Sequence, residues 1–242
     1  MMCGAANDGR GERPCSPAVA RDARPYRIPC EIGIEGFAVW RAQSEDDRPD
    51  VSFVPALARR RLTSVERAAM HVAHEAMARA GAEPAGVPVV FASRWGEIGT
   101  TFKLISQFRE EGEMSPAGFS NSVHNAAPGA ISLFAKNTAP YTSIAGRERS
   151  LESGLLEALA QLLSASGRVL FVFAEESTPE FYRPEFPAVE KGCALAALLG
   201  ASGGVKVEFR HEERPPLSFD ALADFLAETS SFVSSADFLL TR

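Results

Sequence analysis

Apolar residues recur at a spacing of three to four along residues 63–80, and they follow a helix-start signal. The segment begins with the capping pattern Thr63-x-x-Glu66 and places Val65, Ala69 and Val72 on one side. It ends at a glycine, Gly81. Because a side-chain cap followed by this spacing is typical of an amphipathic helix, the pattern predicts a helix over residues 63–80.

Four further segments have helical spacing. Residues 97–112 place Ile98, Phe102, Ile105 and Phe108 on one helical face. The other three predicted helices are Gly129–Lys136, the leucine-rich stretch from Leu151 to about Gly167, and Phe219–Leu226.

Short apolar runs bounded by turn residues separate these helices and predict strands. They are residues 31–40, with an interruption at Gly36, Val87–Ser93, the β-prone run Tyr141–Ala145, 168–176, and two strands at 193–201 and 205–213 on either side of Gly203-Gly204. Strands that alternate with helices indicate βαβ units. We therefore expect an α/β fold with a mixed, mainly parallel sheet of about five strands covered by helices.

Composition bounds the organisation of the chain. With 242 residues, 45% of them hydrophobic, the sequence supports one domain, which we assign to residues 30–242. Residues 1–29 are rich in Gly, Pro, Arg and Asp, so we expect a disordered tail. The tail has no apolar stretch typical of a secretory signal, and no run approaches the ~20 residues of a membrane helix, which predicts a cytoplasmic protein.

Charge and cysteine content exclude several classes of function. A net charge of −6 argues against binding to nucleic acid or to an anionic membrane. The four cysteines, Cys3, Cys15, Cys30 and Cys193, form no CxxC pair, so neither a zinc site nor a disulfide framework is indicated. The spacing of His71 and His74 matches no zinc helix. We expect no metal and no cofactor.

Known catalytic motifs are missing from the sequence. There is no GxGxxG or P-loop pattern. His124 lies among small polar residues, Ser120 to Asn125, and is either a general base or a hydrogen-bonded loop histidine. The run Arg59-Arg60-Arg61 is either a solvated surface or a docking patch for an acidic partner.

One long segment resembles a known family. The sequence SPAGFSNSVHNAAPGAISLFAKNTAPYTSIAG, residues 115–146, resembles the part of β-ketoacyl synthases that leads to the active-site cysteine. Further along, RVLFVFAEE and EKGCALAALLGA are similar to the strands that follow in that family. The resemblance covers about residues 30–210, roughly the N-terminal half of a thiolase-like fold. Among β-ketoacyl synthase-like proteins, the chain resembles the short chain-length factors of aryl polyene gene clusters.

The resemblance has consequences for mechanism. A working synthase carries its nucleophilic cysteine at the start of the helix after this strand, but residues 142–155 contain no cysteine. The position of the family's cysteine falls near Ser150. The family's two catalytic histidines lie in a C-terminal half that a chain of this length is not expected to contain.

The resemblance implies a non-catalytic chain-length factor that pairs with a full ketosynthase. The pairing strand would be Tyr141, Thr142, Ser143, Ile144 and Ala145. Side chains that shape the partner's acyl tunnel, or alternatively pack in the core, would be Phe102, Phe108, Phe119, Val123 and Phe134.

Two other hypotheses remain open. The first is an independent acyl transferase or thioester hydrolase that uses Ser150 or Ser153 with His124. The second is a homodimeric module that binds acyl carrier protein or a free acyl chain, in which Arg59, Arg60 and Arg61, together with Arg147 and Arg149, would contact the acidic carrier.

Overall fold

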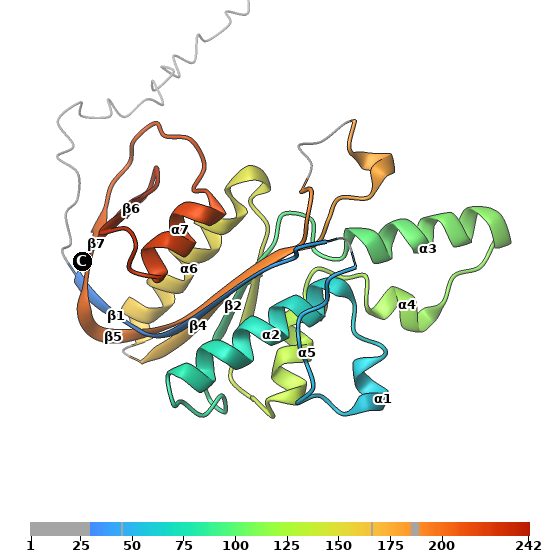
Figure 1. Cartoon of the computed structure of the whole chain (residues 1–242), viewed down its shortest axis with the longest axis horizontal. Coiled ribbons are helices and arrows are strands. Elements are labelled where there is room, and N and C mark those ends of the chain that lie inside the picture. The colour runs from blue at the N-terminus through green and yellow to red at the C-terminus, as the bar shows by residue number, and fades with distance from the viewer. Residues whose placement is uncertain (1–29, 45, 166, 185–188) are drawn as a thin grey trace, which may run out of the picture.

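The fold is one mixed sheet of seven strands with helices on both faces (Figure 1). The computed structural model describes residues 30–44, 46–165, 167–184 and 189–242. The expected N-terminal tail, with Cys3 and Cys15, lies outside the described residues. The strands are β1 (Cys30–Arg41), β2 (Val89–Ala92), β3 (Tyr141–Ile144), β4 (Arg168–Glu175), β5 (Cys193–Phe209), β6 (Phe232–Ser234) and β7 (Phe238–Thr241).

Strand order places β3 at one end of the sheet and β6 at the other. The order is β3-β2-β4-β5-β7-β6, and β1 also pairs with β5. Only β2 with β3 and β2 with β4 run parallel, while the other four described pairings are antiparallel. The predicted mixed sheet covered by helices is confirmed. It has seven strands rather than about five, and its parallel part is limited to β3, β2 and β4.

The glycines near the middle of β5 do not make a turn. The two strands predicted on either side of Gly203-Gly204 are one continuous strand, so that prediction was wrong. This strand pairs with β1 through residues 193–200 and 205–207, and residues 201–204 lie in a register shift opposite Ile32 and Gly33. A Cβ atom on Gly203 would lie 2.4 Å from the Cα atom of Gly33 on β1. These glycines therefore allow two backbones to approach closely. The pairing shifts register near Gly36, where the sequence predicted an interruption.

Helices on the two faces enclose two separate hydrophobic cores. The predicted capping box of α2 is present, because Thr63 Oγ1 accepts the Glu66 amide and the Glu66 carboxylate accepts the Thr63 amide. In Figure 1, α2 and α5 lie on one side of the sheet and α6 and α7 on the other. The helices are α1 (Ala56–Arg59), α2 (Ser64–Arg79), α3 (Ile98–Glu111), α4 (Pro116–Ser120), α5 (Ala126–Phe134), α6 (Ser150–Ala165) and α7 (Phe219–Leu226), with short 3-10 turns η1 (Arg147–Arg149) and η2 (Glu180–Tyr182).

Helix α3 extends away from the sheet toward α4 (Figure 1). Leu104 is its one buried residue, although the sequence places four large apolar residues on one face. Ile105 and Phe108 are both more than half exposed. An apolar helix face without a covering element in the described chain is typical of a surface that contacts something else.

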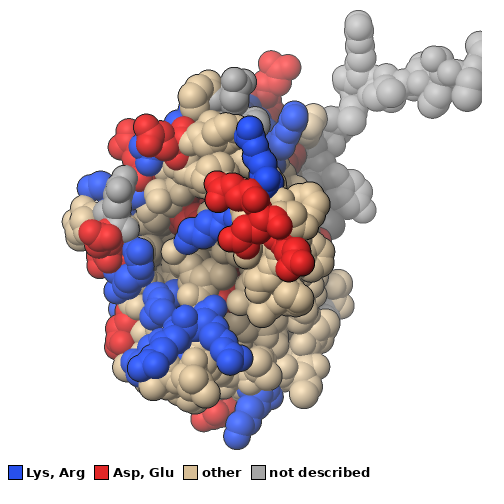
Figure 2. All heavy atoms as spheres, turned by 90° about the vertical axis from the view of Figure 1, so that its right-hand side faces the viewer, with Lys and Arg blue, Asp and Glu red and all other residues tan. Residues whose placement is uncertain are grey.

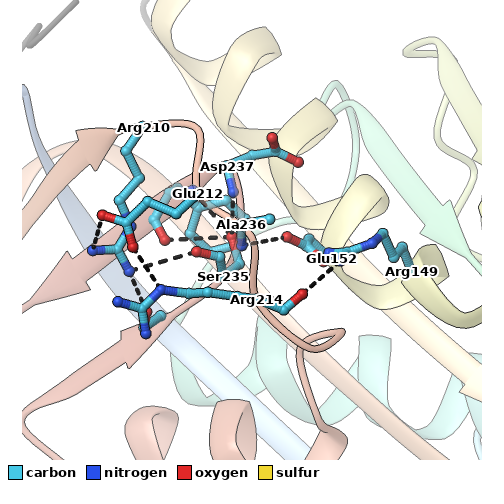
Figure 3. A network of polar contacts seen from close by, with 10 residues as sticks. Arg149, Glu152, Arg210, Glu212, Arg214, Ser235, Ala236 and Asp237 are labelled. Carbon is cyan, nitrogen blue, oxygen red and sulfur yellow. Dashed lines mark hydrogen bonds and ion pairs between the residues drawn. The ribbon is translucent and has the colours of Figure 1, made fainter. Parts of the chain in front are cut away.

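The last part of the chain is anchored to the start of α6 by a buried carboxylate (Figure 3). Glu152 is 1% exposed, and its Oε1 atom accepts the Ala236 amide at 2.9 Å. Its Oε2 atom accepts from Arg149 at 2.7 Å, and Arg149 also donates to the carbonyl of Arg214. Glu152 thus holds the β6–β7 turn and the segment before α7 against α6, which the sequence did not predict.

Replacing Glu152 by alanine is expected to lower the free energy of unfolding by about 2 to 3 kcal/mol. The substitution leaves the Ala236 amide buried without an acceptor and Arg149 without its ion pair. Urea unfolding followed by circular dichroism measures the change. Glu157→Ala on the same helix is the matched control, and an equal loss in both variants would contradict the anchoring role.

Candidate functional site

The corner between β3 and α6 is closed by hydrogen bonds of a serine. Ser150 is 2% exposed, and its hydroxyl donates to the carbonyl of Arg147 at 2.7 Å. The same oxygen accepts the amide of Gly146 at 2.9 Å. The Ser150 side chain therefore stabilises the turn that begins α6, and it does not project freely from the helix start.

His124 is held by two other elements of the same end of the sheet. Its Nε2 atom lies 2.9 Å from the carbonyl oxygen of Ser93, which can only accept, so Nε2 carries a proton. Its Nδ1 atom lies 3.0 Å from the hydroxyl of Ser143. The same hydroxyl donates to the carbonyl oxygen of His124 at 3.3 Å. In this arrangement both ring nitrogens are occupied, and no described hydrogen bond joins His124 to Ser150 or Ser153.

Strand β3 is an edge strand, and one side of its backbone is open. The carbonyls of Pro140 and Ile144 accept amides at the two ends of β2. Because backbone groups of successive residues point to opposite sides of a strand, the amides of Tyr141 and Ser143 point to the free edge. Tyr141 is 40% exposed, and Ala145 is exposed as well.

Several apolar side chains on α3, α4 and the turn after α4 are exposed. The predicted tunnel residues Phe108, Phe119 and Val123 are 52%, 58% and 40% exposed, so the alternative that they pack in the core is wrong for these three. Phe102 stacks on Phe181 of η2, with 5.6 Å between ring centroids. Phe134 is half-buried and packs against the core between α2 and the sheet.

Leu133 on α5 was not predicted, yet it is 71% exposed. It faces a groove that Leu57 and Leu62 also line, between α1, α2, α4 and α5. Helix α5 is short, and its apolar residues cannot all face the sheet. The sequence does not mark which of them remains exposed. Of these helices, α5 packs against the edge strand β3.

The arginine run lies at the end of α1. Arg60 and Arg61 are exposed, whereas Arg59 is half-buried and its carbonyl accepts from Arg67. Figure 2 looks onto the side of the molecule toward which α3 projects, and a group of basic side chains lies on it, with acidic side chains nearby. Arg149 is engaged with Glu152, so of the pair Arg147 and Arg149 only Arg147 is exposed.

Buried carboxylates cluster near the carboxyl ends of β2 and β4. Glu97 is 2% exposed, its Oε1 atom accepts from the hydroxyl of Thr63, and its Oε2 atom has no hydrogen-bond partner in the described chain. Burial, with smaller contributions from Glu66 and Glu176, raises the pKa of Glu97 to about 9. Burial also raises the pKa of Glu175, at the end of β4, to about 7.

These carboxylates were not singled out from the sequence, although Glu175 and Glu176 directly follow an apolar strand. They do not make a metal centre. Within the described ranges, no group of three or more His, Cys, Asp and Glu side chains could hold a metal ion. None of the described helices is long and apolar enough to cross a membrane.

The chain matches the family model described as "Beta-ketoacyl synthase, N-terminal domain" over residues 37–232. The chain belongs to this family. No curated protein matches the sequence. The β-ketoacyl synthase N-terminal domain seen here thus confirms the family resemblance found in residues 115–146.

Solved structures share the fold of this β-ketoacyl synthase domain. A chain of the complex of the ketosynthase ApeO with its chain length factor ApeC, from Xenorhabdus doucetiae, matches with a TM-score of 0.71 and 22% identity, covering 88% of this chain and 99% of that one. The ishigamide ketosynthase/chain length factor matches with a TM-score of 0.59 and 14% identity, covering 77% of this chain and 64% of that one.

A third structure, the complex AntDE:AntF of a type II PKS acyl-carrier protein with its ketosynthase, matches with a TM-score of 0.61 and 10% identity. The match covers 76% of this chain and 71% of that one. At these identities the likeness establishes the fold, and the roles of individual residues in this chain rest on its own geometry.

Proposed function

We propose that this chain is a non-catalytic β-ketoacyl synthase-like subunit, a chain-length factor. It pairs with a full ketosynthase in fatty acid or polyketide-type biosynthesis, such as that of aryl polyenes. The observation that carries the proposal is the corner itself. An open edge strand, β3, leads into a helix start that has no thiol and whose serine hydroxyl is bound to the turn backbone.

The open edge supports pairing with another sheet. A strand with unpaired amides and carbonyls is a template for a strand of a second chain. In this arrangement Tyr141 and Ser143 bond to the partner's corresponding strand, which runs antiparallel, so that one sheet continues through both subunits. Strand β3 is short, and none of residues 137–146 carries a charged side chain that would discourage such pairing.

The exposed apolar side chains of α3, α4 and the turn after α4 support a role in shaping the acyl tunnel. Phe108, Phe119 and Val123 are long or branched and come from α3, α4 and the following turn. In a heterodimer they are covered by the ketosynthase and line the far end of its tunnel. Exposure of an apolar surface of this kind to water costs free energy. Association with a partner that covers the surface recovers that free energy.

Two of the matched structures contain ketosynthases with chain length factors, and a third is an acyl-carrier protein in complex with its ketosynthase. For this chain, Arg60 and Arg61 are the exposed cations with which an acidic carrier protein would make contact. We propose this contact as a weak, salt-dependent one.

Co-expression with full-length ketosynthases from the same source tests the proposal. A stable one-to-one complex in size-exclusion chromatography, with a product length that differs from that of the ketosynthase alone, is the expected result. A homodimer that binds carrier protein without a ketosynthase, or a monomer that hydrolyses acyl thioesters, would contradict it.

Ser150→Ala is expected to change the rate of product formation by the complex less than about twofold. The hydroxyl stabilises a turn and takes no part in acyl transfer, so its loss costs roughly 1 kcal/mol of stability and no activity. Replacing the ketosynthase's own nucleophilic cysteine in a parallel assay sets the baseline. A hundredfold loss with Ser150→Ala would restore the hypothesis of an independent nucleophile.

A further inference from the structure

A cavity of about 430 Å³ lies on the face of the sheet that α2 and α5 cover, opposite α6 (Figure 1). Its floor consists of buried apolar side chains from α2, α5 and β4: Met70, Ala73, Met77, Ile131 and Leu170. A concave space of this volume with an apolar floor is typical of a small-molecule site.

Two stacked rings form one wall of the cavity. Phe53 and His74 lie nearly parallel, with 8° between the ring planes and 4.0 Å between the ring centroids. The turn that carries Phe53 is fixed, because the Asp50 carboxylate accepts the amide and the hydroxyl of Ser52. The carbonyl of Asp50 also accepts from Nδ1 of His71 on α2, at 2.8 Å. The stacked pair is therefore a fixed aromatic surface, which a flat ring or a cation can contact.

The loop after α2 forms another wall, through residues 82–84. This loop is tied to the end of α5 by the buried side chain of Asn137, whose Oδ1 atom accepts the Gly86 amide at 3.0 Å. The Nδ2 atom of Asn137 donates to the carbonyl of Val87 at 2.7 Å. The cavity is therefore bounded by elements that internal hydrogen bonds hold in place.

The rim of the cavity favours a positive charge. Glu83 is exposed, and its carboxylate makes no hydrogen bond or ion pair with another described residue. Ala78, in the last turn of the 16-residue helix α2, lines the same cavity, and the dipole of a helix favours a cation at this end. The arginine of this turn, Arg79, donates to the carbonyl of Phe37 and pairs with Glu75. Among the described residues, no lysine or arginine lines the cavity.

An apolar cavity with an aromatic wall and an unpaired carboxylate at its rim fits one class of ligand. We propose that the cavity binds a small aromatic ammonium compound, an arylalkylamine. Its ammonium group pairs with Glu83 beside the end of α2, and its ring packs between Phe53 and the apolar floor. The binding is reversible and involves no covalent step. The inference goes beyond the proposed function and does not depend on pairing with a ketosynthase.

Isothermal titration of the whole chain with three matched indoles tests the charge preference. Tryptamine carries the ammonium group, tryptophol has a hydroxyl in its place, and indole-3-propionate has a carboxylate. An exposed ion pair beside a helix end is expected to make tryptamine bind about fivefold more tightly than tryptophol. Indole-3-propionate is expected to bind more weakly than either. Hexylamine has the charge without the ring and is expected to bind at least threefold more weakly than tryptamine.

Glu83→Gln tests the ion pair without changing the size of the side chain. The variant is expected to bind tryptamine about fivefold more weakly and tryptophol as before. Glu113→Gln, at an exposed glutamate after α3, is the matched control and is expected to bind both ligands as the unmodified protein does. Ala78→Trp, at an exposed lining position, places a large side chain in the cavity and is expected to abolish binding of both ligands.

Three results would each overturn the proposal: no saturable binding of tryptamine by the unmodified protein, equal binding of tryptamine and indole-3-propionate, or tryptamine binding that survives Ala78→Trp. Unchanged tryptamine affinity in Glu83→Gln would overturn the assigned ion pair. Thermal melts identify any variant that fails to fold, and Glu83→Gln then decides the case if Ala78→Trp is unstable.

Discussion

The double substitution Tyr141→Lys and Ala145→Lys is expected to lower the affinity for the ketosynthase by at least a hundredfold. Both positions are exposed on or beside the open edge of β3, and a desolvated lysine at a strand pairing is costly. Neither substitution removes a backbone hydrogen bond to β2, which uses the groups of Pro140 and Ile144. Size-exclusion chromatography with light scattering and calorimetric titration of the purified pair measure the loss.

The opposite edge of the same sheet provides the control. Phe232 on β6 is 57% exposed, so Phe232→Lys places the same charge on the other end strand. This variant is expected to bind the ketosynthase as the unmodified chain does. Equal weakening by both edges, or full binding by the double lysine variant with an unchanged melting temperature, would show that β3 is not the pairing strand.

Regular periodicity made most elements of the fold predictable. Local sequence preference and tertiary packing agree in these elements. Examples are the capping box of α2, the leucine spacing of α6 and the apolar run of β4. The continuity of β5 was not predictable in the same way. A Gly-Gly pair is a turn signal locally, and only the close approach of Gly33 makes it part of a strand.

The last strands were missed for a related reason. Strands β6 and β7 are three and four residues long, too short to show an alternation, and they are fixed by pairing with β5 and by the contact of Glu152 with the Ala236 amide. Contacts between residues 84 positions apart leave no pattern in the sequence.

The candidate site was likewise predictable only in part. The lack of a cysteine in residues 142–155 was visible directly, and so was the strand before them. That the Ser150 hydroxyl would bond to its own turn, while His124 bonds to Ser93 and Ser143, depends on how three loops meet at one end of the sheet. Glu97 is buried where these loops pack together, and no local sequence pattern predicted its burial.

Glu97→Gln is expected to stabilise the protein at alkaline pH. Glu97 occupies the N-cap position of α3, and its side chain makes no capping hydrogen bond. It accepts from the hydroxyl of Thr63 at the start of α2, and its second oxygen is buried without a hydrogen-bond partner in the described chain. Its pKa of about 9 in the folded protein lies above its ordinary value of 4.5. Above pH 4.5 the unfolded chain ionises this carboxyl and the folded chain does not, so Glu97 lowers the free energy of unfolding increasingly up to about pH 9.

Glutamine has the same shape and stays neutral, so it removes this pH-dependent penalty. Allowing for one buried amide donor without a partner, the expected gain is about 3 kcal/mol at pH 8, or roughly 6 to 12 °C in melting temperature, with no gain at pH 5. Urea unfolding at pH 5, 6.5 and 8 measures it, and Glu110→Gln, exposed on the same helix, is the control. A gain that is equal at all three pH values would mean that glutamine acts through packing, and a loss at pH 8 would mean that Glu97 is ionised in the folded protein and held by a cation.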